Sequence, residues 1–279
     1  SAISFELDVS DGRLAPPGDV AASSLGLPTQ TTLTAVVAFD DGTSTDFTSD
    51  GRLVVEVSEP SNTASSCLQY LGSATLAVVG GASCSSAVVT VSVPSLGVSS
   101  TVSLAIVTFV QLELSTAPYP TYTGATTLPT ASLQRIACTS AAWQNAEVSA
   151  HARLSDASLV DVTSSATIAV GSASTAPASL LSGNVLRPTG AGTVELTASY
   201  AGAATASLSQ PVADTSVSVT AVSLLLPELG GAYEVTFAGQ AGLRTQSAVS
   251  LTFDDGTVFE DATALDAGWI AVTDLLSFS

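Results

Sequence analysis

The sequence predicts an all-β protein in which β-sandwiches follow one another in a linear array, and three observations support this fold class. First, 46% of the 279 residues are apolar and only 11% are charged, and Ser, Thr, Ala and Val dominate. This composition is too apolar for a disordered chain and too poor in Lys, Glu and Met for a helical one. Second, apolar and polar residues alternate in short runs, as they do in strands with one buried face. Third, one strand-and-turn unit occurs three times, which indicates a tandem array.

The repeated unit is an apolar strand that runs into a tight polar turn and out into a second strand. It reads Phe-Asp-Asp-Gly-Thr in the first and third copies and Leu-Ser-Asp-Ala-Ser in the second, and an Asp-x-Thr triplet follows each time. Aspartate and glycine favour tight turns, so each copy is predicted to be a β-hairpin. The turn aspartates are Asp41, Asp156 and Asp255, which are 115 and 99 residues apart.

A second pattern gives nearly the same period. Alternating segments begin at Ile3, Val110 and Val222, which are 107 and 112 residues apart, and loops absorb such differences in length at low cost. The two patterns together predict three repeats. Their expected limits are an immunoglobulin-like sandwich at 1–108, a second at 109–214, and the N-terminal part of a third at 215–279.

Six strands are expected in the first repeat, each an alternating or β-branched run bounded by turn residues such as Pro, Gly and Asp. Six or seven short strands in about a hundred residues is the number typical of a β-sandwich. The expected strands are Ala2–Val9, Thr31–Phe39, Leu53–Val57, Thr75–Val79, Ala87–Val93 and Thr101–Val107.

The junction between the first two repeats has almost no linker. Apolar residues keep an even-numbered phase from Val102 to Leu114, interrupted only at Thr108, and no Gly/Ser-rich spacer is present. We therefore expect the two repeats to be rotationally restricted. Further on, the prolines in 117–122 predict a loop or extended edge, and 190–202 predicts a turn, an alternating strand and another turn.

The hairpin and the segment Gly-Ala-Gly-Thr-Val-Glu-Leu-Thr-Ala-Ser-Tyr at 190–200 together resemble the bacterial immunoglobulin-like group 2 domain of invasin- and intimin-type surface proteins. The resemblance covers about half of each repeat and implies an immunoglobulin-like fold that serves as a spacer or adhesive module. The chain departs from the pattern at Ala157, where glycine is expected, and in the cysteines of the first repeat. The lysine-free, Ala/Ser/Thr/Val-rich composition also resembles the mastigoneme proteins, which form hair-like filaments on green-algal cilia.

Charge limits the range of partners. The chain has six arginines, no lysine and a formal net charge of −18, so it repels nucleic acid and anionic membranes. Such a charge also serves solubility alone. No run of 18 apolar residues occurs, so no membrane insertion is expected in this segment. O-linked glycans on 15–17 and 118–121 are an open alternative, and we expect the chain to be an internal part of a longer protein.

The three cysteines show no metal-binding spacing. Cys67 and Cys84 lie on either side of one strand, and a disulfide between them would stabilise the repeat by roughly 3 kcal/mol. Two buried thiols are the alternative. A disulfide implies an oxidising compartment, hence an extracellular or cell-surface location, the ciliary surface included. Cys138 would then be the odd cysteine, either buried or bonded to a partner outside these repeats.

Catalytic and metal sites are not expected. The single histidine, His151, lies on a strand without a nucleophile motif, and the paired aspartates of the turns suit turn chemistry better than acid–base chemistry. Calcium is the more serious alternative, because aspartate oxygens cluster near the hairpins, although no D-x-D-x-D-G loop occurs.

These observations predict a non-enzymatic, cofactor-free structural segment of an extracellular, filament- or rod-forming surface protein. Two alternatives stay open: an adhesin stalk that presents a separate binding domain, and an accessory module of a secreted carbohydrate-active enzyme. The expected partners are other copies of the chain or other surface and filament proteins. Their contacts would use Ala/Val-rich or aromatic faces around Tyr119, Tyr122 and Trp143, unless these aromatics belong to the core of a monomeric spacer.

Overall fold

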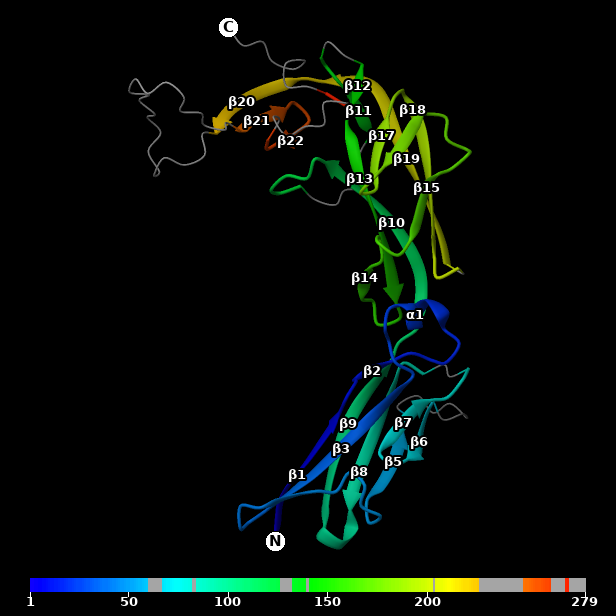
Figure 1. The fold of residues 1–279 in the computed structure, drawn as a ribbon, viewed down its shortest axis with the longest axis vertical. Helices are drawn as coiled ribbons and strands as arrows, with labels where there is room; N and C mark the ends of the chain where they lie inside the picture. The colour runs from blue at the N-terminus through cyan, green and yellow to red at the C-terminus, as the bar shows by residue number, and fades with distance from the viewer. Residues whose placement is uncertain are drawn as a thin grey trace, which may run out of the picture. The chain divides into compact units, whose positions relative to one another are not determined.

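The structure is a computed structural model, and it consists almost entirely of short β-strands (Figure 1). It describes residues 1–59, 67–81, 84–125, 132–138, 141–202, 204–225, 248–261 and 269–270. Within these ranges the chain forms two compact units, each described here by itself. The first unit is Ser1–Leu112 with His151–Val162 and Ser199–Thr205, and the second is Glu113–Ala150, Thr163–Ala198 and Ala206–Ser279.

The first unit contains two facing sheets. One has the order β1-β3-β7-β6, with the short β4 also paired to β3, and the other has the order β2-β9-β8-β5. All pairs are antiparallel except β2 with β9, which is parallel. The strands are β1 Ala2–Val9, β2 Arg13–Leu14, β3 Gln30–Phe39, β4 Ser44–Asp46, β5 Val54–Ser58, β6 Leu68–Gly72, β7 Thr75–Val78, β8 Ser86–Val93 and β9 Val98–Ile106.

The core of this unit lies between its two sheets. Leu33 and Leu76 come from the first sheet, Val89 and Leu104 come from the second, and all four are buried in one cluster. Every second side chain along β3 and β8 is buried, which is the two-residue period of a strand with one covered face. The unit is therefore a β-sandwich.

The same plan recurs in a second sandwich, whose core lies in the second unit. Its sheets have the orders β10-β13-β17-β16, with β14 paired to β13, and β12-β11-β19-β18-β15, and β14 with the adjoining end of β13 belongs to the first unit. Buried residues from both sheets, such as Val148 and Leu186 on one and Val194 and Val212 on the other, form one cluster. The strands are β10 Phe109–Tyr119, β11 Leu133–Ile136, β12 Ala142–Trp143, β13 Asn145–Leu154, β14 Leu159–Asp161, β15 Thr167–Val170, β16 Ala178–Leu181, β17 Val185–Pro188, β18 Gly192–Tyr200 and β19 Ala204–Val217.

A third sheet, β20-β21-β22, follows in the second unit and comprises β20 Val219–Leu225, β21 Ala248–Phe253 and β22 Val258–Phe259. Its aromatic side chains form an edge-to-face series. The ring centroids of Phe253 and Phe259 are 4.8 Å apart, and those of Phe259 and Trp269 are 5.5 Å apart. Ile136 and Val217 belong to the same buried cluster, so the apolar contact continues from the second sandwich into this sheet.

The predicted fold class is confirmed: the chain is all-β and forms immunoglobulin-like sandwiches. All three predicted hairpins are present, as the pairs β3–β4, β13–β14 and β21–β22. The six strands predicted in the first repeat are present, with ends that differ by up to three residues. The repeat limits stay a prediction, and β19 continues through the expected boundary at 214.

Two details go beyond the sequence expectations. For 117–122 a loop or an extended edge was expected, and the structure shows the extended edge as far as Tyr119, since β10 continues through Pro118. The physical reason is that β10 is the edge strand of its sheet, where a missing N–H group breaks no ladder. A helix was not expected, but α1 forms over Val20–Ser24 because the Asp19 carboxylate caps it, accepting from the Ala22 N–H at 2.9 Å.

Candidate functional site: the hairpin turns at the repeat junctions

The three hairpin turns have the same internal geometry. In each, the aspartate Oδ1 accepts a hydrogen bond from the backbone N–H two residues later, at 3.0 Å for Asp41, 3.1 Å for Asp156 and 2.9 Å for Asp255. The hydroxyl of that same later residue also donates to the aspartate, at 2.7, 2.6 and 2.9 Å respectively. These bonds lower the pKa of the Asp41 carboxyl, and the same kind of bond from Ser158 is the main reason for the lowered pKa of Asp156.

The residue after each aspartate takes a left-handed backbone conformation. Gly42 has φ 82° and Gly256 has φ 84°, values that glycine reaches without steric cost. Ala157 occupies the same place with φ 66°. The second repeat therefore keeps the turn despite the loss of glycine, at the cost of crowding its Cβ.

Each of the two later turns is bonded to the residue that precedes the first strand of its own repeat. In the first unit, the Ser155 N–H donates to the Thr108 carbonyl at 2.9 Å, and the Thr108 N–H donates to Ser155 Oγ at 3.0 Å. In the second unit, the Asp254 N–H donates to the Ser218 carbonyl at 3.0 Å, and the Ser218 N–H donates to Asp254 Oδ1 at 3.1 Å. The same reciprocal pair thus occurs twice and ties each turn to a repeat junction.

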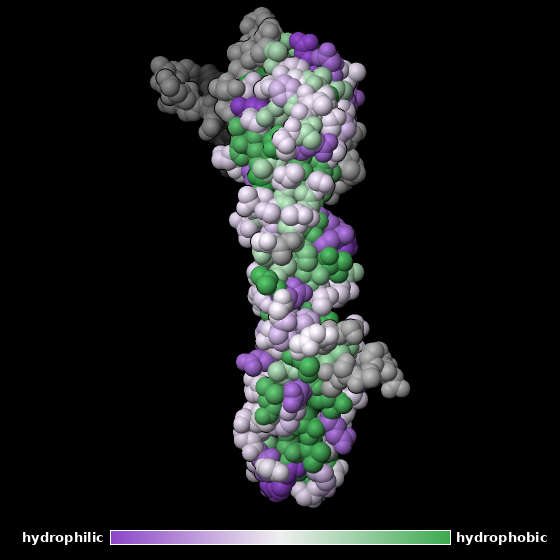
Figure 2. Space-filling view, turned by 90° about the vertical axis from the view of Figure 1, so that its right-hand side faces the viewer, coloured by the Kyte–Doolittle hydropathy of each residue, from purple (hydrophilic) through white to green (hydrophobic). Residues whose placement is uncertain are grey.

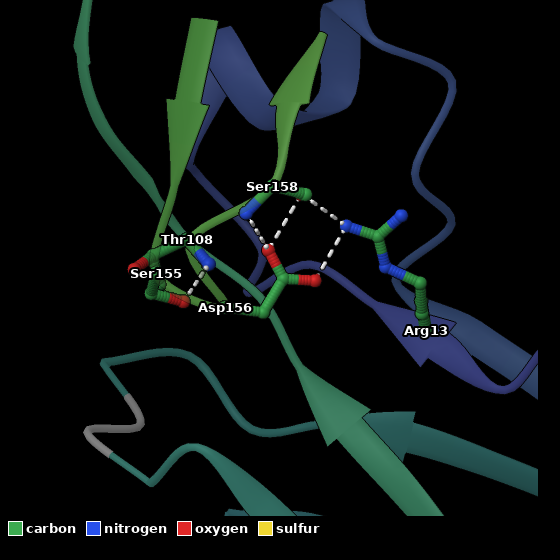
Figure 3. Close-up of polar contacts among 5 residues, drawn as sticks. All are labelled: Arg13, Thr108, Ser155, Asp156 and Ser158. Atoms are coloured by element: carbon green, nitrogen blue, oxygen red, sulfur yellow. Dashed lines mark hydrogen bonds and ion pairs between the residues drawn. The ribbon is translucent and has the colours of Figure 1, made fainter.

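An arginine from the first repeat binds the turn of the second (Figure 3). Arg13 Nη2 lies 2.6 Å from Asp156 Oδ2 and donates to Ser158 Oγ at 2.9 Å. The side chains of Arg13 and Asp156 are 44% and 33% exposed, so water screens the pair and its contribution to stability is about 0.2–1 kcal/mol. The contact therefore orients the Asp156 turn more than it stabilises the fold.

A glutamine from the second repeat binds the turn of the third in the same way. Gln144 Nε2 donates to Asp255 Oδ2 at 2.6 Å and to Thr257 Oγ1 at 3.0 Å, and its Oε1 accepts from the Gln134 N–H at 2.9 Å. Gln144 is only 8% exposed. Because its amide is both buried and bonded at each end, its removal should cost more than the loss of Arg13.

The start of β10 has a further anchor in the first unit. Asp19 Oδ2 accepts from the Phe109 N–H at 2.8 Å, while Asp19 Oδ1 caps α1. The Phe109 ring lies 6.4 Å from the ring of Tyr200, which is 3% exposed. Burial raises the pKa of the Tyr200 hydroxyl. One carboxylate therefore fixes both the short helix and the first strand of the following repeat.

The aspartate of the first turn, Asp41, has no arginine or glutamine donor within the part of the chain that the structure describes. Asp41 is exposed and bonds only to Thr43 there, although the Asp40 N–H donates to the Ser1 carbonyl at 2.9 Å, as in the other two turns. The sequence analysis identified the turn aspartates only as markers of the repeat. It missed Arg13 and Gln144 entirely, because neither lies at a repeated position and their contacts cross more than a hundred residues of sequence.

The cysteines occupy two different settings. The structure joins Cys67 and Cys84 in a disulfide, and the Glu59 carboxylate accepts from the Cys67 N–H. Cys138 is half-buried, and its thiol donates to the Ile136 carbonyl at 3.4 Å. Among the described residues, Glu59, Cys67 and Cys84 are the one group of three or more acidic, cysteine or histidine side chains that lie close together. Both sulfurs of this group are in the disulfide, which removes their metal-binding thiolates.

The histidine and the aromatic residues named from the sequence lie on strands or line a cleft. His151 is half-buried on β13. Trp143 is also half-buried, and its carbonyl accepts from Trp269 Nε1 at 2.9 Å, so it belongs to the interior of the second unit. Tyr119 and Tyr122 line a cleft in the same unit. No helix in the described ranges is long and apolar enough to cross a membrane.

Similarity to known proteins is low in both sequence and structure. No known family and no curated protein matches the sequence. Among solved structures, the chain is similar to domains 4–9 of the surface-layer protein SbsC, with 14% identity, a TM-score of 0.24, and coverage of 80% of this chain and 33% of that one. It is similar to a 282-residue C-terminal fragment of intimin, crystallised with the intimin-binding domain of its translocated receptor, with 12% identity, a TM-score of 0.26, and coverage of 78% and 66%. It is also similar to the EC1-2 segment of human protocadherin-24, with 12% identity, a TM-score of 0.27, and coverage of 77% and 100%.

Proposed function

We propose that the chain is a non-enzymatic structural segment of an extracellular surface protein, in which successive immunoglobulin-like repeats are held end to end as a stiff rod. The observation that carries this proposal is the bond set found at two junctions. Thr108 with Ser155 and Ser218 with Asp254 make the same reciprocal pair, in which one bond joins two backbone groups and the other joins a backbone N–H to a side-chain oxygen. Arg13 or Gln144 then adds a side-chain donor from the preceding repeat.

The physical basis of the stiffness is the direction of these bonds. A flexible linker leaves its backbone N–H and carbonyl groups to water, whereas here the linker residues Thr108 and Ser218 use both groups on the following hairpin turn. Only Val107 and Thr108 lie between β9 and β10, and only Ser218 lies between β19 and β20. A bend at such a junction would break both bonds of the reciprocal pair together with the contact of Arg13 or Gln144.

Small-angle X-ray scattering of the chain tests this proposal. An elongated particle whose profile changes little between low and moderate salt is expected, because each junction keeps a bond between two backbone groups and only the Arg13–Asp156 contact is an ion pair. Replacing Arg13 and Gln144 together by Leu should give the scattering profile of a more flexible chain. Leu71→Ala, on the exposed surface of the first repeat, should leave the profile unchanged. A profile of a compact globule would contradict the rod.

A role in filament assembly, as in a mastigoneme-like protein on a ciliary surface, is the more specific form of this proposal. Each repeat exposes a β-branched apolar residue on its first strand, Ile3 at 64%, Val110 at 54% and Val222 at 53%. Apolar residues reach the surface in several places in Figure 2, whereas strongly polar ones are scattered. With a net charge of −18, copies of the chain repel one another unless such apolar contacts hold them together.

Analytical ultracentrifugation over a concentration series tests the assembly. Association that is strengthened by salt, and that is lost when Ile3, Val110 and Val222 are replaced together by Ser, would support it. Leu159→Ser is the matched control, because Leu159 is 50% exposed but lies on β14 rather than on a first strand. A chain that is monomeric at all concentrations would favour the two alternatives, the adhesin stalk and the accessory module of a carbohydrate-active enzyme. A separate binding domain in the full-length protein would then indicate the stalk, and a catalytic domain would indicate the accessory module.

A further inference from the structure

A cleft in the second unit lies beside the contact that Gln144 makes with the turn of Asp255. Its volume is about 140 Å³, and it lies where the end of β10, the strands β11 to β13 and the hairpin β21–β22 meet. Ring side chains and amide side chains both line it. The residues that line it are Pro118, Tyr119, Tyr122, Ser132, Leu133, Gln134, Gln144, Asn145, Asp255, Thr257 and Phe259.

Asn145 is the unusual residue of this cleft. It is 1% exposed, and neither Nδ2 nor Oδ1 has a hydrogen-bond partner in the part of the chain that the structure describes. A buried amide without partners destabilises a fold, because both its donor and its acceptor have lost water. Gln144, the next residue, shows the contrast, since its amide is bonded at both ends. The free donor and acceptor of Asn145 match a ligand that carries an amide group of its own.

The rest of the lining indicates a neutral ligand with one apolar face. Tyr119 is 37% exposed at the cleft and Tyr122 is half-buried, and such rings stack against the C–H face of a sugar or another flat apolar group. Among the described lining residues Asp255 is the one with a carboxylate, and its Oδ2 already accepts from Gln144. No arginine lines the cleft among the described residues, so an anionic ligand would find no counter-charge.

We propose that this cleft binds the acetamido group of a neutral N-acetylated sugar. The acetamido N–H would donate to Asn145 Oδ1 and its carbonyl would accept from Nδ2, which satisfies both orphaned atoms at once. The sugar ring would lie against Tyr119 or Tyr122. A peptide carries the same amide group, but it needs an extended groove to seat its neighbouring residues, and a cleft of this volume suits one acetylated ring better. This goes beyond the structural role, because it gives the segment a ligand on a surface or polymer.

Saturation-transfer NMR on the whole chain tests the proposal, with the methyl glycosides of N-acetylglucosamine and N-acetylgalactosamine as probes. Saturation that is strongest at the acetyl methyl group is expected. The methyl glycosides of glucose and galactose, which lack the acetamido group, should bind at least tenfold more weakly. A preference for N-acetylalanine methylamide over both acetylated sugars would show a peptide site and overturn the sugar proposal, as would the absence of saturation for every probe.

Two variants and one control connect the binding to the cleft. Asn145→Leu keeps the size of the side chain and removes both polar atoms, so it should abolish binding while raising the midpoint of thermal unfolding. Tyr119→Ala, at an exposed position, should weaken binding at least fivefold and leave the fold intact. Leu71→Ala, exposed on the first unit, should change neither. A lower unfolding midpoint for Asn145→Leu would show that the amide has a structural partner and would overturn the proposal, and so would unchanged binding in Asn145→Leu or Tyr119→Ala.

Discussion

Replacing Gln144 by Leu removes the buried amide that joins the second repeat to the turn of the third. Leucine fills a similar volume, so the change acts on hydrogen bonds more than on packing. Three bonds are lost, to Asp255, to Thr257 and from the Gln134 N–H. Asp255 is exposed, and water takes over much of its bond, which leaves a loss of about 0–1 kcal/mol there.

The other two losses are larger in sum. The bond to the half-buried Thr257 contributes about 1 kcal/mol, and the half-buried Gln134 N–H left without an acceptor costs about 1 kcal/mol more. We therefore expect Gln144→Leu to lower the unfolding free energy of the second unit by about 2–3 kcal/mol. Arg13→Leu breaks the corresponding but solvent-exposed contact of the first unit and should cost less than about 1 kcal/mol.

Urea unfolding followed by tryptophan fluorescence measures the first value directly. Both tryptophans of the chain, Trp143 and Trp269, lie in the second unit, where Trp269 Nε1 donates to the Trp143 carbonyl. The signal therefore reports that unit and should be insensitive to Arg13→Leu. A loss below about 0.5 kcal/mol for Gln144→Leu, or an equal loss in the two variants, would refute the argument that burial makes the glutamine contact the stronger one.

Three further predictions concern the turns, the disulfide and acid stability. Ala157→Gly should raise the free energy of unfolding by about 1 kcal/mol, because it relieves a left-handed alanine at φ 66°, while Gly42→Ala should lower it by about 1–2 kcal/mol. Chemical denaturation of both variants measures these changes, and changes of the opposite sign would contradict the turn geometry. Reduction of the Cys67–Cys84 disulfide, whose cysteines are 17 residues apart, should cost about 3 kcal/mol, and mass spectrometry of non-reduced peptides should find the two linked rather than free. The pKa of the Asp50 carboxyl is lowered from 3.8 to about 2, mainly by hydrogen bonds from the Arg52 side chain. Its contribution to folding stability is therefore present above about pH 4 and is lost as the pH falls toward 2. The midpoint of thermal unfolding should fall less steeply across that window in Asp50→Asn, and parallel curves would exclude the carboxylate as a cause of acid destabilisation.

The sequence predicted those parts of the fold that depend on neighbouring residues. The three hairpins follow from aspartate and glycine in the turns, and the main strands follow from alternation of apolar residues, because both signals are local. The two-residue strand Arg13–Leu14 and the five-residue helix Val20–Ser24 carry no such signal, since they form only against β9 and around the Asp19 cap. Pro118 left a loop and an extended edge as alternatives, because proline is excluded from central strands but accepted at the edge of a sheet, where β10 lies.

Only one side of each candidate-site contact could be predicted from the sequence. The aspartate turns were visible as a repeat, but the donors that bind them were not, because an arginine serves at one junction and a glutamine at the other. Nor does sequence alone show that Asn145 is buried without partners while the adjacent Gln144 is fully bonded. Both facts depend on which side chains the strands bring together in three dimensions.

The most direct test of the central claim is a distance measurement between the first repeat and the hairpin of the second. Spin labels at Ser99→Cys and Leu159→Cys, two exposed positions of the first unit, in a Cys138→Ser background, allow this by pulsed electron paramagnetic resonance. We expect one narrow distance distribution, which broadens when Asp156→Ala and Arg13→Leu remove the side-chain contact. A broad distribution in the otherwise unchanged chain would show that the turn is not held by the preceding repeat.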